Sequence, residues 1–191
     1  MTRNSLMLPV LALAVAGAAT LMTPAQADEI TVRRYSRDYH RSEFAYASRH
    51  QSLPAVFLGN PFAISDQAFQ AALAPALRNS MRQGRLDFTA VTGDRPPSGY
   101  FVVVAVDPPS GVRLDGVCAA PTSLGTDRRS GELRLLALLC RGRTPLAQVQ
   151  GTMAPPDGPA DPAFIDLARR VVRGLAPRWA FQWPHQGRRG D

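Results

Sequence analysis

The sequence predicts an α+β fold, a two-layer sandwich in which a mainly antiparallel sheet carries two helices on one face. Two segments repeat apolar residues at steps of three and four, which is typical of helices with one buried face. Several other segments alternate apolar and polar residues or are continuously apolar, as strands are. These elements follow one another along the chain in the order β, β, α, β, β, β, β, α.

Six segments are predicted to be strands, because each is short and rich in β-branched, aromatic or alternating apolar residues. Residues 100–106 lie between two Pro-Pro-Ser-Gly turns and are nearly all apolar, so they should form a central strand. In the last strand Gln148, Gln150 and Thr152 share one side, which should therefore face water. The predicted strands are residues 30–35 (an edge strand), 55–58, 86–90, 100–106, 133–140 and 146–153, with a hairpin turn at 141–144.

The first predicted helix follows the turn signal Asn60-Pro61, with Ser65 as its N-cap and Gly84 placed to end it. Pro75 interrupts this helix and should bend or split it, because proline has no N–H group to donate. Its apolar face consists of Phe69, Leu73, Ala76, Leu77 and Met81.

The second predicted helix is marked more clearly, with Asp161 as N-cap, Pro162 at the first helical position, and Gly174 and Pro177 at its end. The segments at residues 112–130 and 154–160 show no helix or strand periodicity and are expected to be loops. The second helix buries Phe164, Leu167, Ala168, Val171 and Leu175.

Residues 1–27 are expected to be a cleaved signal peptide. Arg3 precedes an apolar run that ends in Ala25-Gln26-Ala27, a small-residue cleavage site. The alternative is a membrane anchor, but the run is short for a span and is interrupted by polar and small residues. Residues 28–177 should then form a single α+β domain, followed by an aromatic and then flexible tail at 178–191. The location implied is the periplasm or the exterior, with no transmembrane segment left after cleavage.

The basic residues are all arginine, and the chain contains no lysine. This excludes Schiff-base chemistry, Ser-Lys dyads and phosphate loops of the Walker type, each of which needs a lysine amine. The formal net charge of +7 favours an anionic partner. Acidic residues are interspersed with the arginines, however, and there is no nucleic-acid-binding module, so nucleic acid is not an expected partner. An anionic lipid or envelope polymer stays open.

Cys118 and Cys140 are expected to form a structural disulfide, because an exported chain enters an oxidising compartment. Their spacing matches neither paired metal-binding knuckles nor a C-x-x-C redox motif. The alternative is that one of them acts as a nucleophilic thiol with a histidine.

Catalytic and metal-binding residues are not identified with any specificity, so no catalytic residue, metal or cofactor is assigned. His40 lies between Asp38 and Glu43, with His50 nearby, but the spacing matches no metalloprotease motif and is more typical of exposed polar residues. The carboxylates of Asp157, Asp161 and Asp166 could be paired for glycoside hydrolysis, yet Asp161 is better explained as a cap and Asp157 as a turn residue.

Three aromatic residues near the C-terminus, Trp179, Phe181 and Trp183, alternate with smaller or polar ones and would project to one side of an extended segment. One interpretation is a last strand whose rings cover the core. The other is an exposed ridge that binds a partner or the membrane interface. These three residues are therefore the candidate binding residues.

The segments Gly59-Asn60-Pro61-Phe62, Cys118-Ala119, Leu139-Cys140-Arg141-Gly142 and Asp161-Pro162-Ala163-Phe164 resemble those of a group of uncharacterised exported proteins of alphaproteobacteria. Their architecture is similar to small envelope lipoprotein domains such as the amino-terminal domain of TolB. The resemblance implies this architecture and a periplasmic location, and implies no catalytic residues. This chain lacks the lipid-bearing cysteine of the lipoprotein members.

The sequence thus favours a non-catalytic periplasmic protein, an accessory in binding or assembly at the cell envelope, although an enzymatic activity stays open. Its partner would be an envelope protein or an anionic envelope polymer. The alternative is a small exported hydrolase that acts on an envelope polymer or ester.

Overall fold

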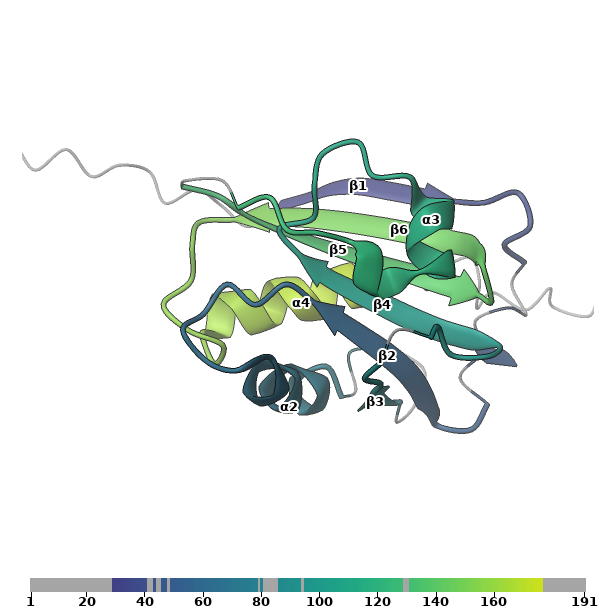
Figure 1. The fold of residues 1–191 in the computed structure, drawn as a ribbon, viewed down its shortest axis with the longest axis horizontal. Coiled ribbons are helices and arrows are strands. Elements are labelled where there is room, and N and C mark those ends of the chain that lie inside the picture. Colours follow the sequence, from purple (N-terminus) through teal and green to yellow (C-terminus); the bar gives the residue numbers. More distant parts are fainter. Residues whose placement is uncertain are drawn as a thin grey trace, which may run out of the picture.

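The computed structural model describes residues 29–40, 43, 46, 47, 49–78, 80, 86–93, 95–128 and 131–176. The expected signal peptide, the domain boundaries at 28 and 177, and Trp179, Phe181 and Trp183 lie outside the described residues and stay predictions. With the labels of Figure 1, the elements are β1 (Glu29–Tyr35), β2 (Ser52–Leu58), α2 (Asp66–Ala76), β3 (Asp87–Ala90), β4 (Tyr100–Val106), α3 (Leu114–Ala119), the 3-10 turn η1 (Pro121–Ser123), β5 (Leu133–Arg141), β6 (Thr144–Met153) and α4 (Pro162–Gly174).

The strands form one six-stranded sheet in the order β1-β6-β5-β4-β2-β3. β1, β6, β5 and β4 pair antiparallel, whereas β2 runs parallel to both β4 and β3. The predicted α+β class is confirmed, and the sheet is mixed rather than purely antiparallel. The parallel part arises because α2 carries the chain from the end of β2 back to the start of β3, as crossover helices do.

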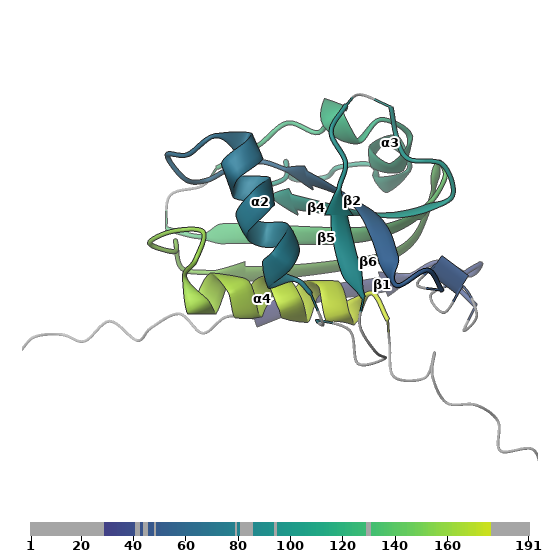
Figure 2. The ribbon, with the colours of Figure 1, turned by 90° about the horizontal axis from the view of Figure 1, so that it is seen from below.

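Helices α2 and α4 cover the same face of the sheet, as the sequence predicts (Figures 1 and 2). Their apolar faces, represented by Phe69 and Phe164, join one core cluster with sheet residues such as Val104, Ala137 and Val149. Two tyrosines from the N-terminal part donate hydrogen bonds to carbonyl groups at the C-terminal end of α4. The hydroxyl of Tyr35 donates to the carbonyl of Gly174 at 2.7 Å, and that of Tyr39 donates to the carbonyl of Leu175 at 2.8 Å.

The start of α2 is as predicted, with the Ser65 hydroxyl accepting from the backbone N–H of Ala68, but its end is not. The helix ends at Ala76, and Leu77 and Arg78 form a turn, so the predicted extension toward Gly84 is wrong at these positions. Pro75 lies in the last turn, where its missing N–H group interrupts the hydrogen-bond ladder. Helix α4 begins and ends where the sequence predicts.

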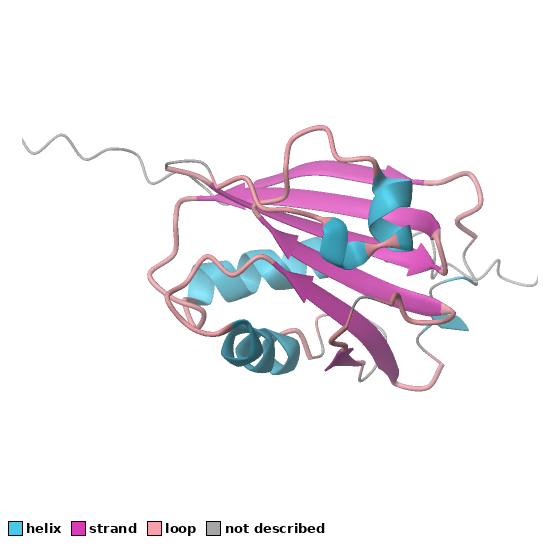
Figure 3. Cartoon of the chain, viewed as in Figure 1, coloured by secondary structure: helices cyan, strands magenta, loops and turns pink. Residues whose placement is uncertain are grey.

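The segment between β4 and β5 is not the featureless loop that the sequence predicts. It contains α3 and η1 and lies over the face of the sheet opposite α4 (Figure 3). Val117 and Cys118 of α3 pack there against Phe101, Val103 and Leu138 in a second apolar cluster. Cys118 forms the predicted disulfide with Cys140 of β5. A six-residue helix is too short to show a period, which is why the sequence does not reveal it.

Candidate functional site

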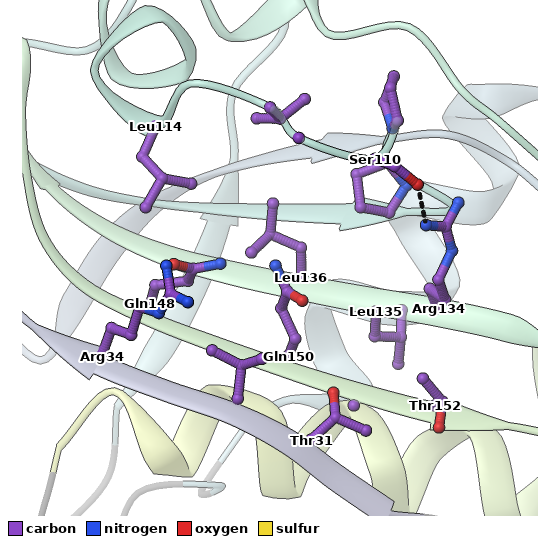
Figure 4. A pocket seen from close by; sticks show the side chains of 16 residues that line it. Thr31, Arg34, Ser110, Leu114, Arg134, Leu135, Leu136, Gln148, Gln150 and Thr152 are labelled. Atoms are coloured by element: carbon purple, nitrogen blue, oxygen red, sulfur yellow. Dashed lines mark hydrogen bonds between the residues drawn. The ribbon is translucent and has the colours of Figure 1, made fainter.

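A groove of about 370 Å³ lies on the sheet face opposite α4, between the loop that joins β4 to α3 and the strands β5, β6 and β1 (Figure 4). Its floor is the sheet and one wall is the loop that leads into α3. Leu114 and Leu136 supply apolar surface, and the polar groups are guanidinium, amide and hydroxyl groups. The groove is lined by Thr31, Val32, Arg34, Pro108, Pro109, Ser110, Gly111, Val112, Leu114, Arg134, Leu135, Leu136, Gln148, Gln150, Gly151 and Thr152.

Strand register determines which polar side chains meet on the floor of the groove. Arg34 of β1 pairs directly with Gln148 of β6, and Gln150 pairs with Leu136 of β5. Because side chains alternate between the two faces of a strand, Gln148, Gln150 and Thr152 project to the same face, away from α4. The backbone of the sheet therefore fixes the order of these groups along the groove.

Gln148 is the least expected of these residues, because it is a polar side chain that is only 6% exposed. Its side-chain oxygen Oε1 is buried and has no hydrogen-bond partner among the described residues. Leaving a buried acceptor unpaired costs about 1–3 kcal/mol of folding free energy. Natural proteins rarely accept that cost without a reason, and a binding role is one such reason.

Arg134 connects the floor of the groove with its loop wall. One terminal nitrogen donates to the Ser110 hydroxyl at 3.2 Å, and the other donates to the Asp127 carbonyl oxygen at 2.9 Å. The backbone N–H of Arg134 donates to the buried carboxylate of Asp107 at 2.9 Å. Its Nε is nevertheless buried without a partner among the described residues. Gln148 and Arg34 thus lie at one end of the groove and Arg134 at the other (Figure 4).

The histidines do not form the acid–base or metal site that was considered from the sequence. Both are exposed, and the only side-chain bond described for either is that of His50 with Arg49, at 2.9 Å. Glu43 instead accepts from the hydroxyl of Tyr100 and from Arg141, the latter at 2.7 Å. Burial, together with the hydrogen bond to Glu43, raises the pKa of Tyr100. Within the described ranges no three His, Cys, Asp or Glu residues are grouped to hold a metal ion.

The aspartates near α4 have structural partners. Asp161 caps the helix, as predicted, by accepting from the N–H groups of Ala163 and Phe164. These bonds, that from Ala163 foremost, lower the pKa of the Asp161 carboxyl together with the bond from the backbone of Asp157. Asp166 pairs with Arg170 at 2.8 Å on the same helix. The carboxylates of Asp161 and Asp166 therefore serve the helix, whereas Asp157 contributes its backbone N–H group.

Sequence reasoning missed Gln148 as a candidate, because the strand pattern placed it on a face expected to be wet. Gln150 and Thr152 on that face are indeed partly exposed, but Gln148 is buried. The signal that could have found the groove is the turn Pro108-Pro109-Ser110-Gly111, which sends the chain back over the sheet instead of away from it.

Comparison with known proteins gives distant structural matches. The chain matches no family model and no curated protein. Among solved structures, a PelC variant dodecamer from Paraburkholderia phytofirmans aligns with 80% of this chain and 99% of its own, at 12% identity and a TM-score of 0.41. A second PelC dodecamer from the same organism has the same identity and coverage, with a TM-score of 0.40. Among the described residues, no helix is both long and apolar enough to cross a membrane.

Proposed function

We propose that this protein is an exported, non-catalytic ligand-binding protein of the cell envelope, and that the groove over β1, β6 and β5 is its binding site. The observation that carries the proposal is the buried side-chain oxygen of Gln148, which has no hydrogen-bond partner among the described residues and lies beside its cross-strand neighbour Arg34. The unpaired amide oxygen of Gln148 costs folding free energy in the free protein. A ligand that donates the missing hydrogen bond would explain why an amide occupies this position.

The construction of the groove favours binding. Its polar floor is carried by three hydrogen-bonded strands, and its loop wall is held by the bonds of Arg134 and Asp107. A site that is formed before the ligand arrives loses less conformational entropy on binding than a mobile one. Guanidinium, amide and hydroxyl groups recognise ligands through hydrogen bonds, as a binding protein requires.

Export and an envelope role rest on independent features. The disulfide between Cys118 and Cys140 supports an oxidising compartment, as does the expected leader at residues 1–27. The resemblance to exported alphaproteobacterial proteins supports the periplasm, where the ligand would be an envelope protein or an anionic envelope polymer. The hydrolase alternative gains no specific observation, since Glu43 contacts Tyr100 and Arg141 rather than a histidine.

The test compares the full exported protein with its Gln148→Leu variant. Leucine fills a similar space and removes the unpaired oxygen, so the variant should be as stable as the wild type or more stable in urea unfolding. Soluble fragments of an alphaproteobacterial envelope are then added to both ¹⁵N-labelled proteins. The proposal expects the side-chain amide signals of Gln148 and Gln150 to shift in the wild type, and binding to weaken at least tenfold in the variant.

Two outcomes would contradict the proposal. If Gln148→Leu loses several kcal/mol of stability, the amide has a structural role that its lack of partners does not reveal. If envelope fragments leave the groove signals unchanged, or bind the variant as tightly as the wild type, the groove is not the binding site.

A further inference from the structure

We infer that the ligand of this groove is an acidic sugar, a ring bearing several hydroxyls and one anionic group, with the anion at Arg34 and a hydroxyl at Gln148. The inference rests on the proposed binding function and adds the chemical class of the ligand. It follows from the charge, the hydrogen-bonding groups and the size of the groove.

The charge of the groove favours an anion. The two charged side chains that line it are Arg34 and Arg134, and none of its lining residues carries a carboxylate. Arg134 already contacts the backbone oxygen and, at 3.5 Å, the carboxylate of Asp127, whereas Arg34 is exposed on the outermost strand. The planar guanidinium of arginine can donate two parallel hydrogen bonds to a carboxylate or phosphate. Arg34 is therefore the cation that an entering ligand meets.

An anion alone does not complete the site. A carboxylate or phosphate dianion only accepts hydrogen bonds, so it would leave the oxygen of Gln148 unpaired. Arg34 and Gln148 are directly paired across β1 and β6, which places their Cβ atoms about 5 Å apart. The ligand must then carry a hydrogen-bond donor close to its anionic group. A hydroxyl both donates and accepts, so it suits the amide whichever way its end is turned.

The rest of the groove continues the same pattern. Thr31 and Thr152 add hydroxyls to the floor, and the buried Nε of Arg134, which has no partner in the described part of the chain, offers a donor at the far end. Several ligand hydroxyls spread over one small ring would match these separated groups. Leu114 and Leu136 give the C–H surface of such a ring something to pack against. The volume of 370 Å³ lies at the lower end of the range for small-molecule sites, about 300–1,000 Å³, which suits a sugar-sized unit.

The experiment titrates the full ¹⁵N-labelled exported protein with four probes: galacturonate, galactose 1-phosphate, galactose and propionate. Galactose keeps the hydroxyls without the anion, and propionate keeps the anion without the hydroxyls. We expect at least one of the two acidic sugars to bind ten or more times as tightly as galactose and propionate, with shifts of the Gln148 side-chain signals. Which of the two binds distinguishes a uronic acid from a sugar phosphate as the source.

Matched variants on β1 test the role of Arg34. Arg34→Gln should weaken binding of the acidic sugar at least tenfold and bring it close to that of galactose. Arg33→Gln removes the same charge from the adjacent position, whose side chain projects to the other face, and should leave binding within about twofold. Equal weakening in both variants would mean that only net charge matters and would overturn the inference.

Failure of the inference and failure of the proposed function give different results. If envelope fragments shift the groove signals but no acidic sugar binds better than galactose and propionate, the ligand class is wrong and the binding function stands. If neither envelope fragments nor acidic sugars affect the groove, both are wrong.

Discussion

Breaking the bond between Cys118 and Cys140 should remove a large part of the stability of this domain. The two cysteines are 22 positions apart, and in the chain-entropy model a loop of this length stabilises the fold by about 3.4 kcal/mol at 25 °C. For a domain of this size, that corresponds to a decrease in melting temperature of about 7–14 °C. Both cysteines are fully buried against β4 and β5, so reduction also leaves two thiols inside the second apolar cluster.

The assay is urea unfolding of the oxidised protein, the reduced protein and the Cys118→Ala/Cys140→Ala variant. Reduction removes the cross-link while keeping both sulfur atoms, and the variant removes the sulfur atoms as well. We expect the reduced protein to lose about 3 kcal/mol and the variant to lose more, because packing in the second cluster is also lost. Reductant should have no effect on the variant. A difference below about 1 kcal/mol between the oxidised and reduced proteins would refute the loop-closure reasoning.

Four further predictions concern other parts of the fold. Gly59→Ala should cost about 2–5 kcal/mol in urea unfolding, because its Cβ would lie 2.3 Å from a backbone oxygen in addition to the left-handed strain. Gly99→Ala, with a similar positive φ and open space, should cost only about 1–2 kcal/mol, and equal costs would contradict the steric explanation. Asp161→Ala should lose about 1 kcal/mol at pH 7, whereas Asp161→Asn keeps a cap. The pKa of Asp161 is lowered in the fold, so its charged carboxylate stabilises the wild type relative to the Asn variant above the ordinary pKa. This difference in unfolding free energy should shrink as the pH falls below about 4, and a constant difference down to pH 3 would contradict the explanation. Burial raises the pKa of Tyr39, so the wild type should lose stability above about pH 10, where the unfolded chain ionises first, and Tyr39→Phe should lose less over that range. Glu43→Gln should cost about 1.5–3 kcal/mol, and a double-mutant cycle with Arg141→Gln should show less than additive loss; full additivity would mean that the pair is not coupled.

Local patterns were sufficient to predict most of the fold. The strand at Tyr100–Val106 and the start of the helix at Pro162 were predicted to the residue, because turns and a cap mark these positions in the sequence. The helix ends at Gly174, the first of the two residues expected to mark its end. The sequence predicts an interruption at Pro75, and α2 ends one residue later, at Ala76. The extension toward Gly84 was expected because the apolar spacing continues past Pro75. The parallel pairing of β2 was missed because strand direction depends on contacts between distant segments, which spacing does not record.

The candidate site was much less accessible to sequence reasoning. Gln148 looks like an ordinary solvent-facing residue of an alternating strand, but in the fold it is buried and lines a groove together with a loop that comes about 40 positions earlier. Its side-chain oxygen lacks a hydrogen-bond donor among the described residues only because of how the chain packs. The sequence contains many donors and does not show which of them lie near Gln148. The disulfide was predictable, since the expected compartment and the number of cysteines left few alternatives. The candidate aromatic residues Trp179, Phe181 and Trp183 stay predictions.

The bonds from Tyr35 and Tyr39 to the end of α4 join residues that are more than 130 positions apart. Strand β1 likewise pairs with β6, its one neighbour among the described strands, which is made late in synthesis. A ribosome must therefore synthesise most of the polypeptide before β1 can pair with β6. The contacts of Tyr35 and Tyr39 with the end of α4 can therefore form only after the segment of α4 has been synthesised.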